Sequence, residues 1–279
     1  MSVRRYFSEG DLLKALVEVG NQLTGDVRVY LIGGCAMTFI GRKAATKDVD
    51  IVLTSTHQVE LFIQAARLAS FRSVEDTSRE YESLGAWNIV ENEEGMRFDV
   101  FDRQVCKCLT IDAGIESRAR FYRKFGRLEV YLMASEDIFL FKAITERELD
   151  LEDLRVLAEH GVNWLTIEDE CLSQRDSGIW AYRLYSKLLE LRKNYGIESP
   201  ILKRLRDHSD LELMKSLFCE VIGNQKMSFE EIARIINDRA RYSSSWTRSQ
   251  LRILVTSGVV KVERKNRRNY YYLSYFPNP

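Results

Sequence analysis

Two short apolar runs, separated by two glycines and a charged connection, constrain the fold of this chain more than any other stretch. The first run covers residues 27–32, and the second covers 48–53 and begins Asp-Val-Asp. Apolar runs of this length, bounded by turn residues, are typical of strands in a buried sheet. Alternate residues of a strand share one face, so Asp48 and Asp50 project together, about 6 to 7 Å apart. The pattern predicts a sheet that carries a pair of carboxylates.

The same stretch has the residue types that bind phosphates. Gly33 and Gly34 let a phosphate approach the backbone closely, and the short helix expected at 35–40 would offer unpaired N–H groups. Asp48 and Asp50 can coordinate one or two divalent cations, Mg²⁺ or Mn²⁺, which bridge phosphate oxygens. An Asp-x-Asp pair alone is common on solvent-facing strand ends, and a glycine pair alone is usually a tight turn. Their combination predicts a site for a nucleoside triphosphate.

A third carboxylate is needed to hold a second cation and to accept the proton of an attacking hydroxyl. Asp99 lies between two apolar residues in the run 97–101, so it would face a cleft while its neighbours face the core. Asp102 would point the opposite way, and we therefore expect Asp99 to be the third ligand and the base. Residues 86–91 and 97–101 are expected to pair as a hairpin.

Arg42 and Lys47, on the connection between the glycines and the aspartates, are placed to reach phosphate oxygens. The spacing Gly-Gly, thirteen residues, Asp-x-Asp and a later single Asp resembles the DNA polymerase beta-like nucleotidyltransferase superfamily over roughly residues 10–160. The run Arg-x-x-x-Thr-Lys-Asp-Val-Asp is similar to the branch that includes abortive-infection and toxin-type nucleotidyltransferases. The resemblance implies Mg²⁺-dependent transfer of a nucleoside monophosphate from an NTP to a hydroxyl, with release of pyrophosphate.

Two further features bear on the nucleotide site that the resemblance implies. Gly34 stands where the superfamily more often has a serine, so the hydroxyl that contacts the terminal phosphate is missing, and Thr46 could replace it only in part. In the branch, a helix with a lysine and a later Asp-x-x-Asp follow the core, and Lys142, Asp150 and Asp153 match them. Residues three and four apart on a helix also form surface ion pairs. Lys142 is therefore either a nucleotide-binding residue or a member of such a surface pair.

Charge is segregated along a chain whose 41 Lys and Arg residues balance 41 Asp and Glu residues. Residues 241–275 hold eight basic residues and one acidic residue, Glu263, so the remainder of the chain is correspondingly negative. Segregation of this kind indicates a surface for nucleic acid. Residues 210–275, which include this basic segment, resemble a winged helix-turn-helix. We expect helices at 211–222, 228–236 and 244–257 and a hairpin at 259–274.

The third of these helices would enter a groove of nucleic acid, and the hairpin, or wing, would neutralise phosphates. The residues expected to contact nucleic acid are Thr247, Arg248, Gln250 and Arg252 on the helix, and Arg264, Lys265, Arg267 and Arg268 on the wing. The nucleic acid would be an RNA acceptor or a DNA operator. Winged helices also serve as protein-docking modules, so a protein partner is the competing interpretation.

The remaining sequence reads mostly as helix, apart from a strand at 128–132. Helices are expected at 8–23, at 57–70, as one continuous helix at 135–160, and over most of 167–223. The predicted fold class is α/β (α+β), with a nucleotidyltransferase core of a mixed sheet and flanking helices, a helical segment and a winged-helix domain. The expected boundaries are 1–163 for the transferase domain, 164–209 for a helical linker or lid, and 210–279 for the winged helix.

Composition bears on the cellular location of the protein and on the state of its cysteines. No run of about 18 apolar residues and no signal-peptide core is present, which predicts a cytoplasmic protein without a membrane partner. The five cysteines are scattered and lack metal-ligand spacing, so we expect reduced thiols. The first hypothesis is a metal-dependent nucleotidyltransferase that acts on an RNA 3′ end, a tRNA or a protein side chain, as a toxin with a neutralising protein partner or alone. The alternative is a DNA-binding regulator or interaction module whose nucleotide-binding domain is catalytically silent.

Overall fold

The computed structural model describes residues 5–74, 88–105, 109–144 and 150–274. The chain forms two compact units, Met1–Leu205 and Arg206–Pro279. Helix α10, Leu202–Ile222, runs across the boundary between them. Each unit has its own buried apolar core, and each is therefore described by itself.

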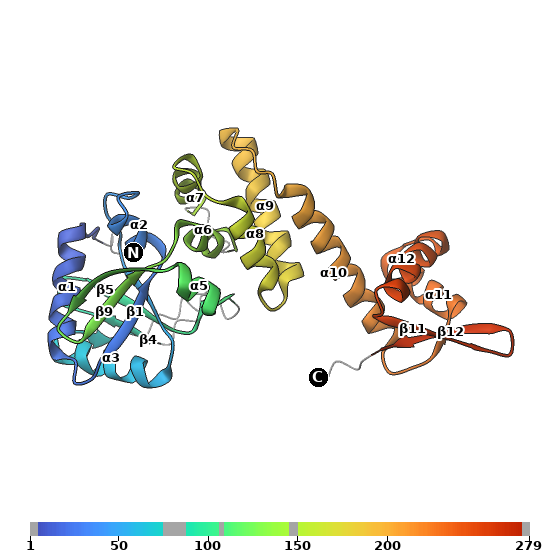
Figure 1. The fold of residues 1–279 in the computed structure, drawn as a ribbon, viewed down its shortest axis with the longest axis horizontal. Helices are drawn as coiled ribbons and strands as arrows, with labels where there is room; N and C mark the ends of the chain where they lie inside the picture. The colour runs from blue at the N-terminus through green and yellow to red at the C-terminus, as the bar shows by residue number, and fades with distance from the viewer. Residues whose placement is uncertain (1–4, 75–87, 106–108, 145–149, 275–279) are drawn as a thin grey trace. The chain divides into compact units, whose positions relative to one another are not determined.

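The first unit is built on a mixed sheet, which has seven strands within the described residues (Figure 1). The strands are β1 Val27–Leu31, β2 Val49–Leu53, β3 Arg72–Ser73, β4 Asn88–Glu91, β5 Arg97–Asp102, β8 Arg120–Phe125 and β9 Leu128–Leu132. Their order across the sheet is β3-β4-β5-β2-β1-β9-β8. Strand β2 runs antiparallel to β1 and parallel to β5, and β4 and β5 form the expected antiparallel pair. The predicted α/β class with a mixed sheet is confirmed.

One face of this sheet is covered by helix α3, Thr56–Leu68, which packs beside helix α1, Glu9–Gln22. Phe62 of α3 meets Phe98 of β5 edge-to-face, with ring centroids 5.3 Å apart. Phe98 and Asp99 are consecutive on a strand, so α3 lies on the face opposite to Asp99. Helix α1 begins close to the expected start at residue 8, and Ser8 and Asp11 form a reciprocal capping box there.

The carboxyl-terminal part of the first unit is a group of helices that follows β9. They are α6 Ser135–Ile144, α7 Asp150–Glu159, α8 Trp164–Ser173 and α9 Ser177–Tyr195. The prediction of one continuous helix at 135–160 is wrong, since α6 and α7 are separate helices that pack against each other. Residues of α8 and α9, such as Ile167 and Leu184, belong to the same buried core as the sheet.

Several short elements complete the first unit. They are α2 Gly33–Phe39, α5 Ala113–Arg118, β6 Gln104–Val105 and β7 Leu109–Thr110, the last two pairing as a separate ribbon. Helix α2 starts at the glycine pair itself, two residues earlier than expected. Strand β8 and helix α5 were not predicted. The mixed basic and aromatic residues at 120–125 have no continuous apolar face that would mark a buried strand.

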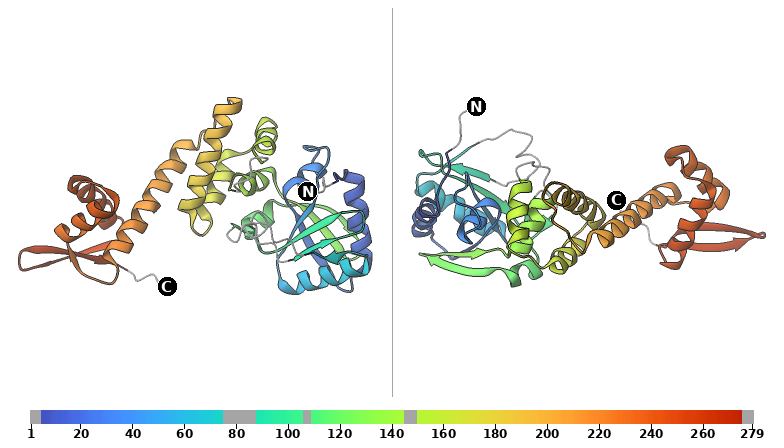
Figure 2. Two further views of the ribbon diagram at one scale, coloured as in Figure 1. Left: turned by 180° about the vertical axis from the view of Figure 1, so that it is seen from behind. Right: turned by 90° about the horizontal axis from the view of Figure 1, so that it is seen from above.

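The second unit contains α10, β10 Met227–Ser228, α11 Phe229–Ala240, α12 Ser244–Thr256, β11 Val260–Lys265 and β12 Arg268–Leu273. Within the described residues its sheet has the order β10-β12-β11. The β11–β12 hairpin projects beyond α11 and α12 in both views of Figure 2. Asn266 and Arg267 form its two-residue turn and both have positive φ, 50° and 63°, as a type I′ turn requires. The helices expected at 228–236 and 244–257 and the hairpin are therefore present, whereas the short helix expected at 211–222 is the end of the longer α10.

The expectations of no membrane-spanning segment and of reduced cysteines can be compared with the described residues only. Among the helices of the described residues, none combines the length and the apolar character needed to cross a bilayer. Cys35, Cys171 and Cys219 carry free thiols, and the first two are buried. Cys106 and Cys108 lie outside the described residues.

Candidate functional site

The strand pairing of the first unit brings two of the predicted site aspartates together. Strands β2 and β5 are parallel neighbours, and Asp50 is the register partner of Asp99. Register partners on adjacent strands point to the same face of a sheet, so these two carboxylates share a face. Asp48 lies one residue before β2 and is half-buried.

Gly33, the first residue of the glycine pair, lies directly against this carboxylate face. The backbone of Gly33 has a φ of +60°, and a Cβ atom built there would lie 2.4 Å from Oδ2 of Asp50. A side chain at this position would therefore meet both backbone strain and the carboxylate. Gly33 also follows Ile32, whose N–H donates to the carbonyl oxygen of Asp50 over 3.1 Å. The chain needs glycine here so that the backbone can approach the aspartate.

Asp99 has a partner that the sequence analysis missed. Nε of Arg97 donates to Oδ1 of Asp99 over 2.9 Å, and both side chains are buried. The two residues are separated by one position on β5, so strand alternation places them on the same face. That alternation was visible in the sequence and could have identified Arg97. The pair neutralises a carboxylate that would be costly to bury alone.

The donor set of the three aspartates suits Mg²⁺ or Mn²⁺, because both cations prefer carboxylate oxygens. Asp50 and Asp99 are adjacent, and Asp48 begins the same strand region as Asp50. Across the part of the chain that the structure describes, no three His, Cys, Asp or Glu side chains already form a ligand set. Asp99 is engaged by Arg97, so metal binding requires its carboxylate to be shared or released.

Thr46 occupies the space that a side chain at position 34 would need. A Cβ atom built on Gly34 would lie 2.6 Å from Oγ1 of Thr46 and 3.8 Å from Nζ of Lys43. Thr46 is itself buried and is fixed by two backbone hydrogen bonds with Phe7, of 2.7 and 3.0 Å. The threonine hydroxyl therefore lies beside the glycine pair, where the resemblance implies a serine hydroxyl.

Lys43 is the second residue that the sequence analysis missed. Its Nζ donates to both carboxylate oxygens of Asp153 on α7, at 2.9 and 2.8 Å. The contact joins residues 110 positions apart, so no local sequence pattern predicts it. Lys43 thereby ties the connection that follows the glycine pair to helix α7.

Lys142 completes a group of four charged residues, called here the lysine cluster: Lys43, Lys142, Asp150 and Asp153. Nζ of Lys142 donates to Asp150 over 2.6 Å and contacts Asp153 at 2.7 Å. Lys142, Asp150 and Asp153 are buried, so the interpretation as a surface ion pair is wrong. The ammonium of Lys142 is engaged by carboxylates here, whereas the sequence prediction assigns it to the nucleotide.

Charge within the lysine cluster is balanced, and the pKa values respond accordingly. Burial alone would lower the pKa of Lys142, but Asp150 and Asp153 outweigh it and raise the pKa above its ordinary value. Burial alone would raise the pKa of Asp153, but Lys142 and Lys43 outweigh it and lower the pKa. Both groups are therefore charged at neutral pH.

The other predicted residues of the first unit lie less centrally. Arg42 is exposed, and Nζ of Lys47 lies 5.3 Å from the ring centroid of Tyr6. The carboxylate of Asp102 accepts a hydrogen bond from Oγ1 of Thr56 over 2.8 Å. Asp99 is buried and in register with Asp50, whereas Asp102 is half-buried and lies on the opposite face of β5.

In the second unit, one of the eight residues expected to contact nucleic acid is wrongly placed. Thr247 is 0% exposed, and its hydroxyl donates to the carbonyl oxygen of Ser243 over 3.1 Å. It therefore packs inside the core of the unit, because position 247 lies on the same face of α12 as Leu251 and Leu254. Gln250 is half-buried. The exposed residues are Arg248, Arg252, Arg264, Lys265, Arg267 and Arg268.

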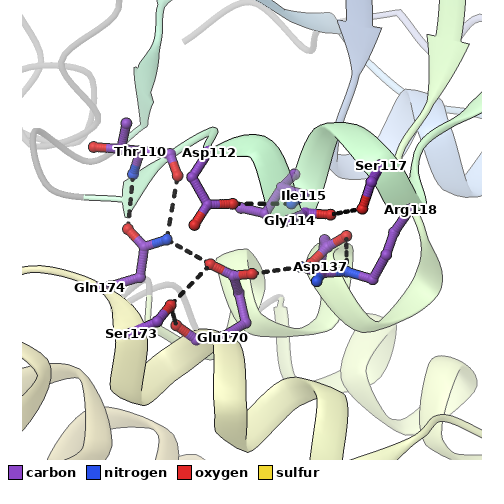
Figure 3. A network of polar contacts seen from close by, with 10 residues as sticks. All are labelled: Thr110, Asp112, Gly114, Ile115, Ser117, Arg118, Asp137, Glu170, Ser173 and Gln174. Carbon is purple, nitrogen blue, oxygen red and sulfur yellow. Dashed lines mark hydrogen bonds and ion pairs between the residues drawn. The ribbon is translucent and has the colours of Figure 1, made fainter.

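A second buried polar group lies on α5, α6 and α8, and we call it the arginine network: Arg118, Asp137, Glu170 and Gln174 (Figure 3). Arg118 donates to Asp137 over 2.6 and 3.2 Å and to Glu170 over 2.5 Å. Nε2 of Gln174 donates to Glu170 over 2.6 Å, and its amide also bonds the backbone of Thr110. The network ties three helices and the β7 segment together.

The comparison with known proteins found no relative of this chain. Neither the models of protein families nor the curated proteins searched with this chain gave a match. The residues themselves therefore carry the functional argument.

Proposed function

We propose that the first unit is a Mg²⁺-dependent nucleotidyltransferase that moves a nucleoside monophosphate from an NTP to a hydroxyl. The observation that carries the proposal is the register pairing of Asp50 with Asp99, beside a glycine whose Cβ would collide with Asp50. Carboxylates on one sheet face beside a glycine pair are the parts that triphosphate chemistry needs.

The aspartates and the glycines have different proposed roles. Asp48, Asp50 and Asp99 would hold the cation, and Gly33 and Gly34 would let the triphosphate approach the backbone. Bound Mg²⁺ would neutralise charge on the triphosphate and on the departing pyrophosphate. These roles follow from oxygen-donor chemistry and from the shared sheet face.

The proposed reaction forms one bond and breaks one. The acceptor hydroxyl oxygen attacks the α-phosphorus, the bond between that phosphorus and the bridging oxygen breaks, and pyrophosphate leaves. Asp99 accepts the hydroxyl proton, and the buried Arg97 holds this carboxylate in place. Lys142 is assigned the role of anchoring Asp150 and Asp153 beside the site.

The test is transfer of label from each α-labelled NTP, with Mg²⁺, to RNA or to a protein extract. We expect labelled acceptor with the wild type and none with Asp50→Asn, which keeps the shape of the side chain and removes its charge. The matched control is Asp102→Asn, three positions beyond Asp99 on the same strand, which should retain transfer. Absence of label on every acceptor, under conditions where NTP binds, would count against the enzyme.

For the second unit we propose a winged helix that binds nucleic acid, as RNA acceptor or DNA operator. The support is a set of exposed cations on α12 and on the hairpin, together with the projecting β11–β12 turn. A regulator with a silent first unit would need this surface as well, so it is the second candidate function.

Binding by the second unit is tested on the wing. We expect Arg264→Ala combined with Arg267→Ala to weaken binding of duplex DNA or structured RNA, and to reduce its dependence on salt. Arg239→Ala is the control, because Arg239 pairs with Glu220 away from the wing. Unchanged affinity and no salt dependence would assign the unit to protein docking.

A further inference from the structure

Three aromatic rings of the second unit are successive neighbours from its core to its surface, and we call them the aromatic series: Phe218, Trp246 and Tyr242. Phe218 of α10 is 0% exposed, Trp246 of α12 is half-buried, and Tyr242, in the connection between α11 and α12, is 42% exposed. The ring centroids of Phe218 and Trp246 are 6.2 Å apart, and those of Trp246 and Tyr242 are 3.8 Å apart. The planes of Trp246 and Tyr242 differ by 14°, so these two rings are stacked.

One face of the Tyr242 ring is accessible to a ligand. The other face is covered by Trp246, so the exposed surface of Tyr242 lies on its outer face and on the edge of the ring. A single exposed aromatic residue is common on protein surfaces. An exposed ring that is already stacked on a second ring is different, because another flat ring can continue the stack.

The backbone on both sides of Tyr242 fixes the position of the ring. Helix α11 ends at Arg241, which has a positive φ of 61°, and helix α12 is capped by Ser243, whose hydroxyl accepts a hydrogen bond from the N–H of Trp246. Between these residues, the carbonyl oxygen of Tyr242 accepts a hydrogen bond from Nδ2 of Asn237 over 3.1 Å. A ligand that stacks on Tyr242 therefore does not have to order this connection first, which reduces the entropic cost of binding.

The charge around Tyr242 indicates which kind of flat ring would stack there. Residues 241–252 contain three arginines, Arg241, Arg248 and Arg252, and no acidic residue, and all three arginines are exposed. Guanidinium groups pair with phosphates, and aromatic rings among such cations are what proteins use to bind single-stranded nucleic acid. A base inside a duplex has both faces covered by its neighbours, so only an unpaired base can stack on the ring.

We propose that Tyr242 is a stacking platform for one unpaired base of a single-stranded nucleic acid, and that Arg241, Arg248 and Arg252 contact the phosphates of that strand. The inference rests on the proposed binding of nucleic acid by the second unit, and it narrows the ligand to a strand with an unpaired base. Such a strand fits an acceptor RNA better than a duplex operator. Single-stranded DNA offers the same chemistry, so the test includes both strands.

The test measures binding of oligouridine and oligothymidine to the full chain by fluorescence anisotropy, with the matching duplexes for comparison. Each strand carries one 2-aminopurine, at the 3′ end, in the middle or at the 5′ end, because the emission of this base falls when it stacks on an aromatic ring. We expect the wild type to bind the strands more tightly than the duplexes and to quench the emission. The oligouridine and oligothymidine arms show whether the preferred strand is RNA or DNA.

Substitutions of Tyr242 separate stacking from packing. Tyr242→Leu should weaken strand binding about tenfold, the contribution of one stacked base, abolish the quenching, and leave duplex binding within about twofold. Tyr242→Met, which keeps an apolar cover on Trp246 without a flat ring, should behave in the same way, and Tyr242→Phe should retain both the affinity and the quenching. Ile253→Ala is the matched control, because Ile253 is a 44% exposed apolar residue on α12 outside the aromatic series, and strand binding should stay within about twofold.

A tyrosine that only covers the core gives different results. It predicts that Tyr242→Leu lowers the melting temperature while the bound 2-aminopurine is quenched as in the wild type, and that outcome would overturn the proposal. Equal binding of strands and duplexes by the wild type, or no quenching at any position of the base, would overturn it as well. Binding that depends on salt and on Arg264 and Arg267 but not on Tyr242 would remove the platform and leave the nucleic-acid function standing. A wild type that binds no nucleic acid would remove both.

Discussion

The lysine cluster and the arginine network both bury charged side chains between helices of the first unit, but they differ in charge balance. The lysine cluster has two ammonium groups for two carboxylates, and the arginine network has one guanidinium, Arg118, for the two carboxylates of Asp137 and Glu170. A balanced group keeps its charges over a wide pH range, whereas a group with an excess carboxylate takes up a proton more easily. The first arrangement keeps its ion pairs as the pH changes, and the second is a structural tie whose strength depends on pH.

The pKa values follow this difference. Burial raises the pKa of Asp137 from 3.8 to about 6, and the hydrogen bonds from Arg118 only partly oppose it. Asp153 is also buried, yet two lysines lower its pKa. The number of cations around each carboxylate, and not burial alone, decides the direction.

The largest effect is expected from removing Lys142. Lys142→Met leaves the buried carboxylates of Asp150 and Asp153 with Lys43 as the remaining cation of the cluster, and we expect the free energy of unfolding to fall by about 5 kcal/mol. Urea titrations followed by tryptophan fluorescence, in a Trp246→Phe background that limits the signal to the first unit, measure this. Lys14→Met, at an exposed pair with Glu18, should change the value by less than about 1 kcal/mol. Equal effects of the two substitutions would contradict the buried cluster.

Removing Arg118 should have the next largest effect, and it should depend on pH. Arg118→Met leaves Asp137 and Glu170 buried without their cation, and we expect a loss of about 4 kcal/mol at pH 8. The loss should be smaller at pH 5, because Asp137 is then largely protonated. The same urea titrations measure it, with Arg72→Met at an exposed pair with Glu93 as the control. A loss that is the same at both pH values would show that the network does not titrate.

Asp137→Asn tests the direction of the pKa shift. The folded-state pKa is raised above the ordinary value of 3.8, so Asp137 contributes stability at low pH that is lost as the pH rises towards about 6. The unfolding free energy of the wild type relative to Asp137→Asn should therefore fall by at most about 3 kcal/mol between pH 4 and pH 7. Asp26→Asn, at an exposed carboxylate, should show no such trend. Parallel pH profiles of wild type and Asp137→Asn would refute the shift.

The smallest effect is expected from Lys43. Lys43→Met should lower the free energy of unfolding by about 1 to 2 kcal/mol, because Asp153 keeps its contact with Lys142. Urea titration measures this loss beside that of Lys142→Met. A loss as large as that of Lys142→Met would mean that the two lysines are equally structural, and the comparison between an accessible and an enclosed cation would fail.

Much of the local structure was predictable because short-range physics decides it. The capping box at Ser8 and Asp11, the hairpin of β4 and β5, and strand β9 at 128–132 follow from residue type and periodicity. The break between α6 and α7 was not predictable in this way, since the helical pattern continues through both. The burial of Thr247 was missed because its small side chain gives a weak periodic signal next to Leu251 and Leu254.

The sequence by itself determined that Asp50 lies on a strand, that glycines precede it, and that Asp99 lies within another strand, because alternation and backbone freedom act over a few residues. Only the tertiary structure decided that Asp50 and Asp99 are register partners, that Thr46 fills the space beside Gly34, and that Lys43 meets Asp153. These contacts depend on which strands become neighbours and on how α7 packs against the sheet connection. The free energy of packing the whole first unit determines the strand neighbours and the position of α7. A local sequence pattern does not include this energy.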